Sequence, residues 1–163
     1  MSARPPRSFE DLAVGEYRQS APRRVSREEI LAFARQWDPQ WFHADPEAAQ
    51  GSVFGEVVAS GIHVLALWRQ MDHEINGDID FVCGVGWDEL RLKRAVRAGD
   101  AIHVTSRIEA LRPSRSGQPR GTAITRYAVV LSDGPLAGTE CVSFLSTNLV
   151  YTREGRQGSG CEG

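Results

Sequence analysis

One stretch near the middle of the chain predicts a helix that is buried on almost every side. Ser60 is a good helix N-cap, and a helical segment follows from Ile62 to about Ile75, where Asn76-Gly77 ends it. Residues 64–68 are apolar almost all round the helix, which is the pattern of a helix inside a core and not of one on a surface. We therefore expect this helix to lie in the core of the fold.

The rest of the chain predicts strands. Apolar side chains partly alternate with polar ones, and short polar or glycine-containing segments separate the runs. Connections this short favour antiparallel pairing. One buried helix with a largely antiparallel sheet defines an α+β domain of two layers. The predicted strands are Glu16–Val25, Glu89–Val96, Ala101–Leu111, Thr122–Leu131 and Glu140–Tyr151.

Composition is that of an ordinary globular protein. The chain has 163 residues, of which 41% are hydrophobic and 25% charged, with a formal net charge of -2. This length suits one domain, and the charge gives no reason to expect nucleic acid or a membrane as a partner. No apolar run is long enough to span a bilayer.

The cysteines and the chain ends add three expectations. Three widely spaced cysteines fit a reducing compartment, so we expect a cytoplasmic protein. The start, residues 1–8, lacks the apolar region of a signal peptide and is expected to be disordered. One domain is expected over residues 9–152, followed by a flexible Gly-rich tail at residues 153–163.

A short segment rich in aromatic residues carries the candidate chemistry. Residues Ser26 to Glu29 match a capping box, and the helix that they start should end at Asp38, because the following proline disfavours helical geometry there. Asp45-Pro46 predicts the start of a second helix. Asp38 and His43 would then share a connector, where they could form an acid–base pair. The alternative is that Asp38 only ends a helix and His43 is structural.

The residues from Asp38 to Ala49 form the motif D-P-Q-W-F-H-x-D-P-x-x-A. This motif resembles the signature of MaoC-like, (R)-specific enoyl-CoA hydratases. The resemblance implies a single hot-dog domain, in which an antiparallel sheet of about five strands wraps around the long helix and a helical overhang carries the motif. It also implies a homodimer or a larger assembly of dimers. Further matches follow in order within residues 8–152: Phe9-Glu10-Asp11-Leu12 with Gly15, Phe54-Gly55, Ala59-Ser60-Gly61, Asp88-Glu89-Leu90-Arg91 and Val96-Arg97-Ala98-Gly99-Asp100.

The resemblance also implies a reaction. It is the reversible hydration of a 2-enoyl-CoA, or of a carrier-protein thioester, to an (R)-3-hydroxyacyl thioester in fatty acid metabolism. Asp38 and His43 would be catalytic and would activate one water molecule. The N–H of Gly61, at a helix N-terminus, would polarise the thioester carbonyl, with Ser60 in a supporting role. CoA would be part of the substrate, and no metal or other cofactor is expected.

Two positions depart from the family signature. Gln40 and Trp41 stand where the family usually has Asn and Pro. The amide of Gln40 could still hold His43 or a water molecule. Trp41 and Phe42 are candidates for the acyl pocket, and the alternative is that both belong to an ordinary core.

Other polar clusters have weaker claims to function. Arg112, Arg115 and Arg120 lie in a basic loop, which is either a solvated hairpin connection or a contact with the phosphates of CoA. The acidic segment from Asp72 to Asp80 resembles a calcium loop, but two of its positions lack the expected ligands, so we expect a solvated loop and no metal.

Two other functions stay open from the sequence. An acyl-CoA thioesterase on the same fold would also use a carboxylate and a helix N-terminus, but on the acyl carbonyl. A non-catalytic acyl-CoA-binding subunit would keep the pair in a closed pocket.

Overall fold

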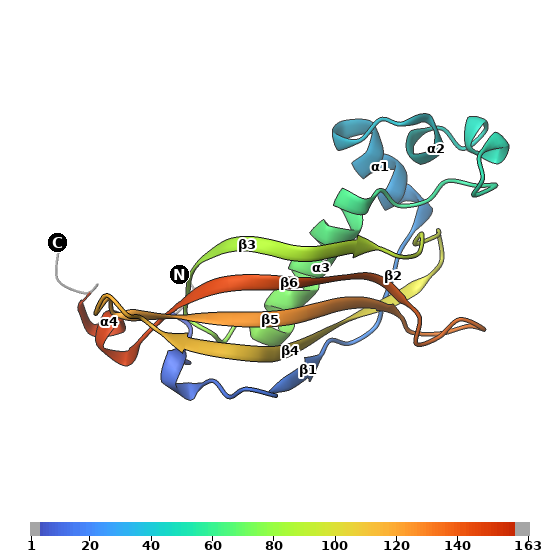
Figure 1. Cartoon of the computed structure of the whole chain (residues 1–163). Coiled ribbons are helices and arrows are strands. Elements are labelled where there is room, and N and C mark those ends of the chain that lie inside the picture. Colours follow the sequence, from blue (N-terminus) through green and yellow to red (C-terminus); the bar gives the residue numbers. More distant parts are fainter. Residues whose placement is uncertain (1–3, 159–163) are drawn as a thin grey trace.

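A computed structural model describes residues 4–158 of the chain. One antiparallel sheet dominates the structure, and its strands follow the order β1-β4-β5-β6-β3, with β2 also paired to β4 (Figure 1). The long strands are β3 (Phe81–Leu92), β4 (Ala101–Pro113), β5 (Arg120–Leu131) and β6 (Glu140–Tyr151), and the short ones are β1 (Tyr17–Gln19) and β2 (Arg23–Arg24).

The helix α3 (Gly61–Asn76) lies across one face of this sheet (Figure 1). Ser60 caps it, because the Ser60 Oγ accepts a hydrogen bond from the His63 N–H at 3.2 Å. Trp68 is 2% exposed and packs edge-on against Tyr127 and Phe144 of the sheet, at 5.0 and 4.7 Å between ring centroids. The predicted helix is confirmed, and its inner face builds part of the main core. It is not buried on almost every side in the single chain, because Ile62 is 59% exposed and Ala66 is exposed as well.

Two further helices form an overhang beyond the end of the sheet (Figure 1). These are α1 (Arg27–Trp37) and the short α2 (Trp41–Ala44), which precedes a 3-10 turn at Ala48–Gly51. The Ser26 Oγ accepts from the Glu29 N–H at 3.1 Å, as the capping motif predicts. A sheet around one helix with a helical overhang confirms the predicted α+β hot-dog fold.

Two strand predictions were wrong in extent. The strand expected at Glu16–Val25 is divided into β1 and β2, because Pro22 lacks the N–H that a continuous strand would need. The strand expected from Glu89 begins eight residues earlier, at Phe81. Three register shifts against β6 interrupt its alternation, and Glu89 takes a positive φ of 54°, so the pattern hides most of its length.

The chain ends also differ from the expected disorder. Arg7 exchanges backbone hydrogen bonds with the segment at Asp78, at 2.9 Å, and Ser8 is fully buried. Residues Arg153–Gly158 form a helix, α4, whose first residue forms an ion pair with Asp11. Their polar composition did not show that these residues have partners far along the chain. Residues 1–3 and 159–163 lie outside the described part.

The acidic segment from Asp72 to Asp80, which begins inside the last turns of α3, is not a solvated loop. Asp72 and Asp80 are only 1% and 5% exposed. The Asp72 carboxylate accepts hydrogen bonds from Arg69 and Asn76, both at 2.8 Å. These buried carboxylates accept hydrogen bonds from arginine and asparagine side chains. The pattern of neighbouring residues in the sequence did not indicate that they would be buried.

No helix within residues 4–158 is both long and apolar enough to cross a membrane.

Candidate active site

Asp38 stands at the end of α1. Its N–H donates to the carbonyl of Ala34 at 2.9 Å, so Asp38 is the C-cap of that helix, as Pro39 predicted. Its side chain is half-buried. Asp38 therefore lies at the hinge between α1 and α2.

We expected His43 to lie on an irregular connector, but it lies in the short helix α2. The helical turn starts at Trp41, because the carbonyl of Gln40 accepts from the His43 N–H at 2.8 Å. Asp45, where we placed the helix start, caps the next turn instead: its Oδ1 accepts from the Glu47 N–H at 2.9 Å.

One backbone carbonyl orients the imidazole of His43. The Nδ1 atom of His43 lies 2.7 Å from the carbonyl oxygen of Val58. A carbonyl oxygen can only accept a hydrogen bond, so Nδ1 carries the proton. In the neutral ring, Nε2 is then an acceptor. His43 is 8% exposed and lines a cavity, so its Nε2 is prepared to accept a proton in a sheltered place.

Gly61 opens α3 at the same cavity. Its backbone N–H has no acceptor within the described residues, as expected for the first turn of a helix. A Cβ atom at this position would lie 2.6 Å from Cδ1 of Leu92, so glycine permits the close approach of another group. A free N–H at the positive end of the helix dipole suits a carbonyl oxygen that gains negative charge.

The cavity shared by these residues has a volume of about 330 Å³. Phe42, His43 and Phe54 line it from the overhang, Gly61 lines it from α3, and residues 92–96 line it from the connection after β3. The Phe42 ring packs against His43 and Phe54, at 4.4 and 5.8 Å between centroids. Aromatic side chains thus shield one side of the imidazole from water.

Several predicted site residues do not line this cavity. Asp38, Gln40, Trp41 and Ser60 are absent from its walls in the single chain. The Gln40 side chain is exposed and forms no hydrogen bond with His43. Trp41 is 50% exposed and packs edge-on against Phe42. Of the two acyl-pocket candidates, the structure therefore brings only Phe42 into the cavity.

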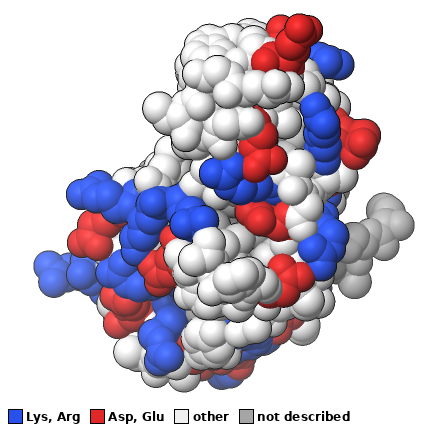
Figure 2. All heavy atoms as spheres, turned by 90° about the vertical axis from the view of Figure 1, so that its right-hand side faces the viewer, with Lys and Arg blue, Asp and Glu red and all other residues white. Residues whose placement is uncertain are grey.

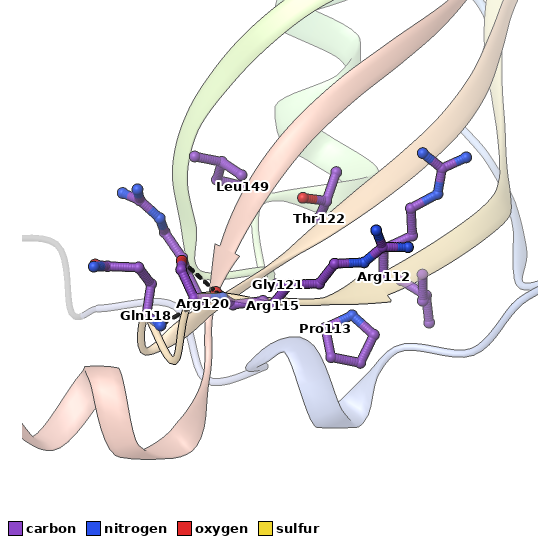
Figure 3. A pocket seen from close by; sticks show the side chains of 11 residues that line it. Arg112, Pro113, Arg115, Gln118, Arg120, Gly121, Thr122 and Leu149 are labelled. Atoms are coloured by element: carbon purple, nitrogen blue, oxygen red, sulfur yellow. Dashed lines mark hydrogen bonds between the residues drawn. The ribbon is translucent and has the colours of Figure 1, made fainter.

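The three arginines predicted to contact CoA lie elsewhere. Arg112, Arg115 and Arg120 line a separate cavity of about 750 Å³ on the hairpin between β4 and β5. Figure 3 shows Arg120 on one side of Thr122 and Arg112 and Arg115 on the other. This hairpin is at the opposite end of the sheet from the overhang (Figure 1), so one chain does not bring these arginines to His43.

Five residues at the site were missed as functional candidates. Leu92, Lys93 and Arg94 line the cavity, and so does Phe54, which the sequence marked only as a family match. The Val58 carbonyl was also missed, because every residue has a carbonyl and the sequence has no signal for its use.

A second histidine joins the overhang to α3. The His63 ring stacks on Phe33 of α1, with 4.5 Å between centroids, and its Nδ1 is buried without a hydrogen-bond partner in residues 4–158. Burial lowers the pKa of His63 below its ordinary value. His63 is thus a neutral packing residue.

No three or more His, Cys, Asp or Glu side chains within residues 4–158 are grouped so that they could hold a metal ion.

A sheet around one long helix, with a histidine and a helix N-terminus in one cavity under an overhang, defines a hot-dog enzyme. The family described as MaoC like domain matches residues 9–129, and the chain belongs to this MaoC-like dehydratase family. The crystal structure of the MaoC-like dehydratase from Rhodospirillum rubrum is 33% identical, with a TM-score of 0.79, and the match covers 90% of this chain and 97% of that one. The family confirms the predicted hydro-lyase class.

Two further relatives are more distant. The 3-hydroxyacyl-thioester dehydratase Z of Mycobacterium tuberculosis is 29% identical over 122 residues, which is 72% of this chain and 80% of the relative. The (R)-hydratase from A. caviae shares the fold, with a TM-score of 0.62 at 22% identity over 88% of this chain and 98% of that one.

Proposed function

We propose that this protein catalyses the reversible hydration of a 2-enoyl thioester to an (R)-3-hydroxyacyl thioester. The observation that carries the proposal is the cavity that His43 and Gly61 share, with His43 Nδ1 held by a carbonyl. A base and an oxyanion donor then face one small space. Relatives that are named thioester dehydratase and (R)-hydratase support this substrate class.

The proposed reaction uses one water molecule. His43 Nε2 accepts a proton from the water while its oxygen bonds to C3 of the enoyl group. The C2–C3 π electrons move toward the thioester carbonyl, whose oxygen gains negative charge beside the Gly61 N–H. A proton is then delivered to C2. Both groups add to the same face, and water attack on the face of C3 that leads to the (R) configuration gives the proposed product. The reverse sequence is the dehydration.

Asp38 is the proposed partner of His43. The support for its role is the spacing of the two residues in the family motif and its position at the hinge before α2. It would accept a hydrogen bond from the same water and so orient it, while the protonated His43 passes the proton that it took from this water to C2. Ser60 supports the site by capping α3. Gln40 and Trp41 lie within the motif, between Asp38 and His43. This chemistry needs no metal or redox cofactor. We also propose a cytoplasmic location, from the three widely spaced cysteines.

The edge of the sheet supports a homodimer. β3 pairs with β6 on one side and with no other strand of residues 4–158. Its exposed side chains include Val85 and Trp87, at 61% and 49% exposure. A long edge strand with exposed apolar side chains is a template for pairing with another chain, so we propose that a second copy pairs there. Whether the hairpin arginines Arg112, Arg115 and Arg120 contact the CoA of a partner chain stays a prediction.

The test is hydration of crotonyl-CoA, followed by the loss of enoyl-thioester absorbance, with chiral analysis of the product and a free-thiol assay. We expect an (R)-3-hydroxyacyl product without free thiol. Asp38→Asn and His43→Gln should each lower kcat by about 10²- to 10⁴-fold. The matched control is His73→Gln, an exposed histidine of α3 outside the cavity, which should keep wild-type turnover. Released thiol without hydration would show a thioesterase, and full activity of His43→Gln would remove His43 from the mechanism.

A further inference from the structure

The mouth of the catalytic cavity carries positive charge. Lys93 and Arg94 follow β3 and line the same cavity as His43 and Gly61. No Asp or Glu is among the described residues that line it. A ligand that enters this cavity therefore passes a cationic wall before it reaches the imidazole.

Only one of these two cations is available to a ligand. The ammonium group of Lys93 forms an ion pair with Glu140. The Arg94 side chain makes no hydrogen bond or ion pair within residues 4–158 and is exposed. Its neighbour Arg97, by contrast, pairs with Glu56. Arg94 is therefore a free guanidinium at the rim of the site.

The backbone holds Arg94 in place. The N–H groups of Lys93 and Arg94 both donate to the carbonyl of Cys141, at 2.8 and 3.2 Å. The Ala59 N–H donates to the Val96 carbonyl at 2.9 Å, which ties this wall to the segment before α3. Figure 2, which views this end of the molecule, shows a largely uncharged overhang with Lys and Arg side chains below it, interspersed with Asp and Glu.

We propose that Arg94 binds a phosphate at the end of the pantetheine arm of the substrate. This inference rests on the proposed thioester function. With the thioester carbonyl at Gly61, the arm must leave through the mouth of the cavity, and it ends in a phosphate both in CoA and in carrier-linked substrates. A guanidinium binds phosphate through two parallel hydrogen bonds, and Arg94 is the cation placed to do so.

The test compares wild type and Arg94→Gln on three substrates: crotonyl-pantetheine, crotonyl-4′-phosphopantetheine and crotonyl-CoA. For wild type we expect KM to fall when phosphate is added. Arg94→Gln should raise KM for phosphate-bearing substrates by about tenfold, the scale of one charge-assisted hydrogen bond, with kcat within twofold. Its kcat/KM on crotonyl-pantetheine should equal that of wild type.

The pattern across substrates identifies the phosphate. An effect that is complete with 4′-phosphopantetheine assigns the contact to the arm phosphate, which CoA and carrier proteins share. An effect seen only with crotonyl-CoA assigns it to the nucleotide phosphates, and the preferred carrier is then CoA.

Two controls separate this contact from general charge effects. Arg91→Gln removes an exposed arginine near the end of β3 that does not line the cavity, and should leave KM and kcat for all three substrates unchanged. Replacement of Arg112, Arg115 and Arg120 by Gln tests the distant hairpin. Equal losses on all three substrates for Arg94→Gln, or loss of the phosphate effect only in the hairpin variant, would overturn the assignment to Arg94. If wild type turned over none of the three, the proposed function itself would fail.

Discussion

Replacement of Gly61 by alanine should separate catalysis from folding. The new Cβ would lie 2.6 Å from Cδ1 of Leu92. Leu92 is 62% exposed, so its side chain can rotate into solvent at little cost. Alanine also favours a helix over glycine by roughly 0.5–1 kcal/mol. These terms oppose each other, so the free energy of unfolding should change by less than about 1 kcal/mol, which is about 2–4 °C in Tm for a chain of this size.

Activity should respond much more strongly. The Cβ projects into the cavity beside the N–H that we assign to the thioester carbonyl, and it would hold that oxygen away from its donor. Loss of one oxyanion donor costs about 10²- to 10³-fold in kcat. We expect a loss of this size in crotonyl-CoA hydration, with a thermal melt near that of wild type.

A double variant tests the cause of the loss. In Gly61→Ala combined with Leu92→Ala, the new Cβ no longer meets the leucine. If displacement of Leu92 caused the loss, activity would return; if the Cβ itself blocks the carbonyl, it would not, and we expect the second result. Turnover of Gly61→Ala within threefold of wild type would refute the assignment of this N–H.

Three other predictions concern stability and assembly. Burial lowers the pKa of His63 below 6.5, so the stability gained from its neutral form is present above about pH 6.5 and is lost as the pH falls below that value. Between about pH 7.5 and about pH 5.5, the free energy of unfolding of His63→Phe, measured with denaturant, should therefore fall less than that of wild type. Equal falls for the two proteins would contradict this. Asn76→Ala removes a hydrogen-bond donor to the buried Asp72 carboxylate and should lower the free energy of unfolding by about 2–3 kcal/mol. This corresponds to a fall of about 4–12 °C in Tm by calorimetry, and a fall of less than about 2 °C would contradict the prediction. Val85→Lys should convert a dimer of 18.0 kDa chains to monomers in light scattering, whereas an unchanged mass would place the interface away from β3.

The sequence predicted those parts of the fold that depend on local pattern. The helix after Ser60 follows from one capping residue and a run of apolar side chains, and its observed bounds differ from the prediction by one residue at each end. The strand β6 was predicted with its observed bounds, from a partial alternation of apolar and polar residues. β3 was shortened, because Gly84 and Gly86 have no side chain to show an alternation and three register shifts break the period.

The candidate site was only partly predictable, since its geometry depends on distances across the fold. The motif brought His43 forward as a candidate, but it could not show which ring nitrogen carries the proton. The sequence alone cannot distinguish Arg94 from Arg115, because each is an arginine in a polar connection next to a strand. Only the position of each connection relative to the overhang distinguishes them, because β3 ends at the overhang whereas β4 leads away from it.

Backbone hydrogen bonds, more than side chains, connect the parts of this site. The segment before α3 holds His43 through the Val58 carbonyl and holds the connection after β3 through the Ala59 N–H. That connection is held in turn by the Cys141 carbonyl of β6. Because these contacts do not depend on side-chain identity, residues such as Phe42 and Leu92 can vary without displacing the imidazole or the helix N-terminus. The fold thereby separates the chemistry, which is fixed by the backbone, from the shape of the pocket, which is set by side chains.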